Sequence, residues 1–71
     1  MSRLRPLEFR EVLRLLSDAG FRPVSQRGSH LKLRHRDGRI IIVPIHSGRP
    51  IKVGLLHRIL RDAGIDLRRL R

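Results

Sequence analysis

The chain has 71 residues and no cysteine, and its 17 lysine and arginine residues outnumber six acidic residues, for a net charge of +11. This length suits one domain with a marginal core, and the lack of cysteine excludes disulfide bonds and thiolate metal sites. The charge favours a polyanionic partner, above all nucleic acid, because neutralised phosphates release counterions. The alternative is a solvated basic surface in an arginine-rich proteome.

Two further features of the composition bear on compartment and ligand. Met1–Arg5 contains no apolar run long enough for a signal peptide or a membrane span. With the missing cysteines, this predicts a cytoplasmic protein without a membrane partner. The two aromatic residues, Phe9 and Phe21, fit core positions, so no platform remains for stacking unpaired bases. Binding should therefore use backbone and shape, as with duplex RNA.

The first predicted element is an amphipathic helix over residues 7–19. Its apolar residues follow helical spacing at Phe9, Val12, Leu13, Leu16 and Ala19. Pro6 suits the first turn. Gly20 suits the left-handed residue that ends such a helix, and Phe21 suits the hydrophobic contact that accompanies it.

Three strands are expected next. Residues 22–26 predict a short strand, which Pro23 confines to a sheet edge or a strand start. Residues 30–35 alternate, which directs two leucines to one face and His30, Lys32 and Arg34 to the other. The pair Asp37-Gly38 is a two-residue hairpin signal, so residues 39–43 should return antiparallel.

The third predicted strand, residues 39–43, is apolar on both faces. One face can pack on the helices, and the other needs a different cover. A second protein molecule could supply it, which would make the chain a homodimer through this strand. The alternative is an edge strand with two exposed isoleucines.

The remaining residues predict a loop, a second helix and a tail. Pro44 stops the sheet, and residues 45–50 are rich in turn formers. A helix over 52–63 buries Leu56, Ile59, Leu60 and Ala63. Residues 66–71 form a basic tail that frays. The order α-β-β-β-α, with both helices on one face of an antiparallel sheet, predicts a two-layer α+β sandwich in a single domain, 1–71, with its core over about residues 7–65.

The best candidate for chemistry is Arg27-Gly28-Ser29-His30. Glycine lets the backbone approach a ligand, serine offers a hydroxyl, and histidine accepts a proton near neutral pH. Metal-free RNA cleavage needs such a base and cations that hold the phosphate. Arg27, Lys32 and Arg34 are the candidate cations. Their charge should also disfavour the imidazolium form of His30.

Other polar residues have plainer interpretations. Ser29 suits a turn better than a nucleophile, because no acidic residue is placed to complete a triad. His46 could cap its loop or contact RNA, and His35 and His57 are predicted to be solvated. The four histidines and six acids show no metal-ligand spacing, so we expect neither metal nor cofactor.

The order and spacing of the motifs resemble the HicA family of toxin endoribonucleases over about residues 7–65. They are Ala19-Gly20-Phe21 at a helix end, Gly28-Ser29-His30 opening a strand, Val43-Pro44-Ile45-His46, and the closing Gly54, Ile59-Leu60 and Ala63-Gly64-Ile65. The resemblance implies a double-stranded-RNA-binding-domain-like fold, cleavage of mRNA and inhibition by a HicB-type antitoxin. It places the active-site histidine on His30, with Gly28 and Ser29 beside it and His46 as the second motif histidine.

The chain departs from the family pattern at two places. Leu55 stands where threonine is common, which should weaken a hydrogen bond at the helix start, and the C-terminus is a short arginine-rich tail. Two other functions remain open. One is a non-catalytic duplex-RNA-binding module, and the other is a basic interaction protein that uses its apolar third strand.

Overall fold

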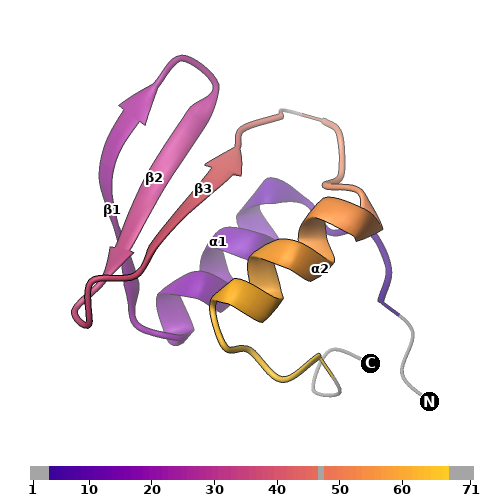
Figure 1. Cartoon of the computed structure of the whole chain (residues 1–71). Coiled ribbons are helices and arrows are strands. Elements are labelled where there is room, and N and C mark those ends of the chain that lie inside the picture. Colours follow the sequence, from indigo (N-terminus) through magenta and orange to yellow (C-terminus); the bar gives the residue numbers. More distant parts are fainter. Residues whose placement is uncertain (1–3, 47, 68–71) are drawn as a thin grey trace.

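A computed structural model describes residues 4–46 and 48–67. Its elements are α1 (Phe9–Asp18), β1 (Phe21–Arg27), β2 (His30–His35), β3 (Ile40–Pro44) and α2 (Val53–Asp62). The order along the chain is the predicted α-β-β-β-α (Figure 1). The fold is α+β and resembles a double-stranded-RNA-binding domain.

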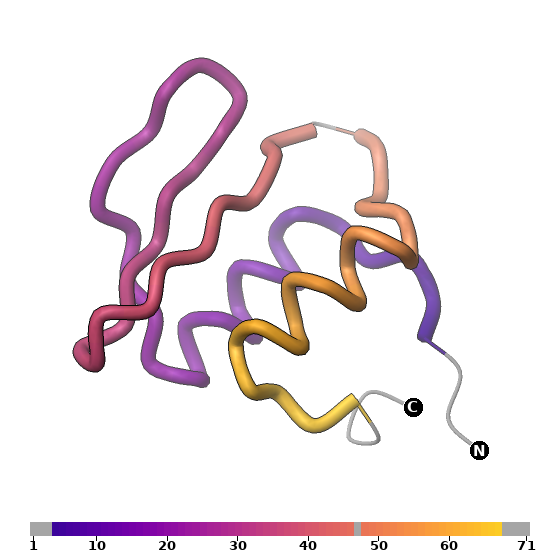
Figure 2. The backbone as a smooth tube through the Cα atoms, in the orientation of Figure 1, coloured from indigo at the N-terminus to yellow at the C-terminus, as the bar shows by residue number. Residues whose placement is uncertain are grey.

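The three strands form one antiparallel sheet in the order β1-β2-β3, and both helices cover the same face of it (Figure 2). The predicted alternation of β2 is confirmed, because Leu31 and Leu33 are buried while their neighbours are exposed. β3 alternates in the same way, with Ile41 and Val43 buried. These side chains join the buried residues of both helices in one core, which includes Val12, Leu16, Phe21, Leu56, Ile59 and Leu60.

The start of α1 differs from the prediction by two residues. Glu8 is the N-cap, and the carboxylate of Glu11 accepts its backbone N–H at 3.1 Å. Leu7 is extended and buried, and its carbonyl accepts the N–H of Ile51 at 2.7 Å. Since this bridge holds Leu7 outside the helix, Pro6 precedes the first turn and does not form part of it.

Both helices end as the sequence indicates. Gly20 has a φ of +98°, and Phe21 directly after it is fully buried. Gly64 repeats this at φ +74°, where the N–H of Ile65 bonds to the carbonyl of Leu60 at 3.0 Å. A left-handed glycine followed by an apolar residue closes each helix and turns the chain back to the core.

The turn between β2 and β3 differs from the predicted two-residue hairpin. The N–H of His35 donates to the carbonyl of Arg39 at 2.9 Å. These two residues close the turn, so residues 36–38 form the loop. Gly38 has a φ of +98°, which fits a three-residue loop that ends in a left-handed residue. β3 therefore begins at Ile40, one residue later than predicted.

The other boundaries shift by one residue. β1 is one residue longer at each end than predicted, and it is an edge strand, as Pro23 requires. Pro44 is the last residue of β3 and pairs with His30. In the predicted tail, Leu67 packs against the core, whereas 68–71 lie outside the described residues. In the part of the chain that the structure describes, no helix is long and apolar enough to cross a membrane.

Candidate functional site

The outer face of the sheet, opposite the helices, carries the predicted site residues. His30, Lys32 and Arg34 alternate along β2 and are all exposed. Strand pairing sets Arg27 opposite His30 and Ile42 opposite Lys32. The face is therefore cationic along β1 and β2 and apolar along β3.

A surface hollow of about 490 Å³ lies on this face. Ser25, Arg27, His30, Lys32 and Ile42 line it. Directly paired strand residues have Cα atoms about 5.5 Å apart in a hydrogen-bonded pair, and alternate residues along a strand are about 6.6 Å apart. One phosphodiester in the hollow can therefore reach an imidazole and two cations together. We call this the His30 hollow.

The turn before β2 fixes the place of His30. Gly28 and Ser29 form a two-residue loop, because Arg27 pairs with His30. Gly28 has a φ of +58°, whereas Ser29, like every other non-glycine residue that the structure describes, has a negative φ. This is the type II′ pattern, which needs glycine at its first central position. Glycine is needed at position 28 for its positive φ and not for lack of space, because nothing lies within 4 Å of where a Cβ would be.

Two hydrogen bonds hold this turn. The side-chain amide of Gln26 donates to the carbonyl of Gly28 at 3.2 Å. The N–H of Ile45 donates to the carbonyl of Ser29 at 2.6 Å. The second bond extends the β2–β3 ladder past Pro44, so the turn is anchored to the chain that leaves β3. The main chain beside His30 is therefore held from both sides.

Four predicted residues do not line the His30 hollow. Gly28 and Ser29 form the turn beside it, and His46 and Arg34 line other hollows. His46 is exposed and lines two other hollows, one of about 520 Å³ with Phe9 and one of about 230 Å³ with Leu55. Arg34 lines a hollow of about 370 Å³ with Arg22. Of the predicted cations, only Arg27 and Lys32 share the hollow of His30.

Sequence reasoning missed two residues of the His30 hollow, Ser25 and Ile42. A two-residue turn at Gly28-Ser29 fixes the register and sets Ser25 opposite Lys32. Recognition of that turn would therefore have found Ser25. Ile42 follows from the alternation of β3, in which even-numbered residues face outward.

His35 was predicted to be solvated, and this is wrong. Its side chain is only 20% exposed, and its ring meets the ring of Phe21 edge-on with centroids 5.1 Å apart. The N–H of Asp37 donates to His35 Nδ1 at 3.1 Å. His35 lies on the inner face at the end of β2, so it packs where the chain turns from α1 into the sheet.

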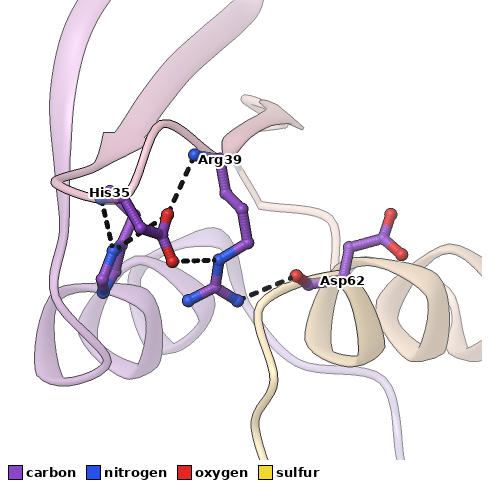
Figure 3. A network of polar contacts seen from close by, with 4 residues as sticks. His35, Arg39 and Asp62 are labelled. Carbon is purple, nitrogen blue, oxygen red and sulfur yellow. Dashed lines mark hydrogen bonds and ion pairs between the residues drawn. The ribbon is translucent and has the colours of Figure 1, made fainter.

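His35 forms a polar cluster with Asp37 and Arg39, shown in Figure 3. The Asp37 carboxylate accepts the backbone N–H of Arg39 at 3.0 Å and its Nε at 2.8 Å. The backbone hydrogen bond is the main reason why the pKa of Asp37 lies below its usual range, and the guanidinium adds to it. Arg39 also donates to the carbonyl of Asp62 at 3.3 Å and lies over the Phe21 ring at 5.3 Å. This cluster ties the β2–β3 turn to the end of α2.

Within residues 4–46 and 48–67, no three histidine or acidic side chains gather so that they could hold a metal ion. Comparison with protein families matches residues 9–65 to the family described as "HicA toxin of bacterial toxin-antitoxin". The chain belongs to the HicA toxin family. The HicA match includes every residue that lines the His30 hollow. It confirms the resemblance and makes this HicA protein the toxin of a toxin–antitoxin system, with an antitoxin as its partner. No curated protein matches this HicA chain.

Proposed function

We propose that this toxin is a metal-independent endoribonuclease that cleaves mRNA in the cytoplasm and is inhibited by a HicB-type antitoxin. The observation that carries the proposal is the His30 hollow, where an exposed imidazole lies beside Arg27 and Lys32. A base and phosphate-binding cations are the groups that metal-free RNA cleavage needs. Family membership supports the same activity.

In the proposed reaction His30 takes the proton of a ribose 2′-hydroxyl. The 2′-oxygen then attacks the adjacent phosphorus, so the O2′–P bond forms and the P–O5′ bond breaks. The products are a 2′,3′-cyclic phosphate and a 5′-hydroxyl, whose oxygen takes its proton from water. Arg27 and Lys32 stabilise the charge that develops on the phosphate.

The outer face also suggests how the RNA lies. Phe21 is buried and Phe9 is on α1, so neither aromatic residue of the chain belongs to this face. Contacts with the RNA backbone therefore dominate. Arg34 lies beyond Lys32 along β2 and would meet a neighbouring phosphate. His46, outside the hollow, would contact RNA further along.

The first experiment incubates purified toxin with an RNA transcript in the presence of a chelator. We expect cleavage to persist with chelator and to fall about 10²–10⁴-fold in His30→Ala, the usual contribution of a general base. His57→Ala is the matched control, because His57 is exposed on α2, away from the hollow. A transcript with 2′-deoxyribose at the cleaved position should stay intact. Equal cleavage by His30→Ala and the unaltered chain would contradict the proposal.

The basic outer face favours a second candidate, a non-catalytic duplex-RNA-binding module. Such a module would bind RNA with strong salt dependence and leave it intact. Failure to bind RNA even at low salt would favour a basic interaction protein. For that function the exposed Ile40 and Ile42 are the relevant surface. The homodimer through residues 39–43 stays a prediction.

A further inference from the structure

The two edges of the sheet differ in how they are protected. β1 contains Pro23, which has no N–H, and its register with β2 shifts between Pro23 and Ser25. Proline and an irregular register both oppose the addition of another strand. β3 forms the other edge, and Ile40, Ile41, Ile42 and Val43 form a regular ladder with β2. β3 is therefore the edge that can accept a strand.

The hydrogen bonds flanking β3 show which main-chain groups are open. His35 bonds to Arg39, and Ile45 bonds to Ser29, so the odd-numbered residues of this segment direct their N–H and carbonyl groups to β2. Alternate residues of a strand direct these groups to opposite sides. Ile40 and Ile42 therefore direct theirs to the open edge. In the described part of the chain no strand pairs with that side of β3.

The side chains around this edge are apolar, with cations at one end. Ile40 and Ile42 are 52% and 51% exposed. Where β3 ends, Pro44 and Leu55 share a hollow of about 230 Å³, which the cations Arg49 and Lys52 also line. The surface thus combines open main-chain groups, two apolar side chains and a partly apolar hollow with positive charge.

We propose that an extended segment of the antitoxin adds to β3 as a fourth strand and pairs with the main chain of Ile40 and Ile42. Apolar residues of that segment cover the two isoleucines, and an acidic residue enters the hollow beside Arg49 and Lys52. Main-chain pairing supplies affinity, and the side-chain pockets supply specificity, as in other complexes formed by strand addition.

Charge favours the antitoxin over a second copy of the chain. Each copy carries +11, so two copies repel each other, whereas an acidic segment is attracted. The family assignment makes an antitoxin the toxin's partner. The inference rests on that assignment and not on ribonuclease activity, so it survives if His30 proves non-catalytic.

Amide hydrogen exchange of the toxin, alone and bound to the antitoxin encoded with it, tests the proposal. Exchange at Ile40 and Ile42 should be fast in the free toxin and at least about tenfold slower in the complex, because their N–H groups become paired. Ile41 and Val43, already paired with β2, should be protected in both samples. Unchanged exchange at Ile40 and Ile42 in the complex would overturn the proposal. Protection of these amides in a concentrated free toxin that forms dimers would overturn it in favour of a second copy.

Variants at Ile40 separate main-chain pairing from side-chain contact. Ile40→Pro removes an outward N–H at the first residue of β3, where proline is tolerated, and should weaken antitoxin binding about tenfold. Ile40→Thr keeps the N–H and should have a smaller effect. Val24→Thr is the matched control for Ile40→Thr, since Val24 is 53% exposed on β1. The affinity of this control variant for the antitoxin should not change. Circular dichroism establishes that each variant is folded. Equal affinity of folded Ile40→Pro and the unaltered chain would overturn the proposal.

Discussion

His30 and His35 lie at the two ends of β2, and their surroundings are opposite. His30 is exposed on the outer face beside the Gly28-Ser29 turn. In β1, which pairs with His30 through Arg27, the one buried residue is Phe21 at the far end of the strand. His35 lies on the inner face, packed against Phe21 and bonded to Asp37. The five-residue step from His30 to His35 places the two side chains on opposite faces of the sheet and at opposite ends of β2.

The comparison separates the end of β2 where we propose chemistry from the end that holds the fold. The His30 end offers polar groups to solvent and few packing contacts. The His35 end joins the β2–β3 turn to α2 through Arg39 and Asp62. A cation near the C-terminal end of a helix is also favoured by the helix dipole. We therefore expect substitutions at the first end to change activity and those at the second to change stability.

The largest expected difference is between alanine substitutions of the two histidines. His30→Ala should abolish most cleavage and change the free energy of unfolding by less than about 0.5 kcal/mol, because the side chain is exposed. His35→Ala should lower the free energy of unfolding by about 1–3 kcal/mol, since it removes a ring contact and a hydrogen bond. Urea unfolding and cleavage at a temperature where both variants are folded provide the two measurements. Loss of cleavage in folded His35→Ala would break the comparison.

A smaller difference should separate two glycines with positive φ. An added Cβ at Gly20 would lie 2.8 Å from Nε2 of His35, whereas one at Gly28 meets nothing within 4 Å. Gly28→Ala should therefore cost only the conformational penalty of a non-glycine residue at the first position of a type II′ turn, about 1–3 kcal/mol. Gly20→Ala should cost about 1 kcal/mol more, because the held His35 ring must move.

The two substitutions near His35 should not be additive. In a His35→Ala background the added methyl group of Gly20→Ala meets no ring, so its cost should fall towards that of Gly28→Ala. Chemical denaturation of the single and double variants measures this coupling. Full additivity would show that the imidazole is not the obstacle.

The smallest expected effect is on acid stability. The pKa of Asp37 is lowered in the folded chain by the backbone N–H of Arg39 and then by its guanidinium. A lowered folded-state pKa contributes stability that is present above the unfolded value, about 3.9, and is lost as pH falls through the folded value. Thermal unfolding of Asp37→Asn should thus depend less on pH below about 4 than that of the unaltered chain. An identical acid slope in the two proteins would show that the carboxylate is not linked to folding.

Particular residues show which features of the fold could be predicted from the sequence. Alternation at Leu31 and Leu33 predicted the two faces of β2, and Gly20 and Phe21 predicted the end of α1. The position of Leu7 was not predictable, because its bridge to Ile51 joins residues 44 positions apart. The packing of His35 was missed for a similar reason, since it depends on Phe21 and Gly20 being brought against it. Arg27, His30 and Lys32, which the sequence grouped together, share one hollow in the structure, whereas Ser25 and Ile42 were not predicted to join them.

The sequence by itself determined the element order, the family and the face on which His30 lies, because these follow from local periodicity, capping residues and short motifs. Only the tertiary structure decided which cations share a hollow with His30, that His46 lies outside it, and which edge of the sheet is open. Those properties depend on strand register and on contacts between distant residues. A shift of one residue in pairing would move each of them while leaving the local pattern unchanged.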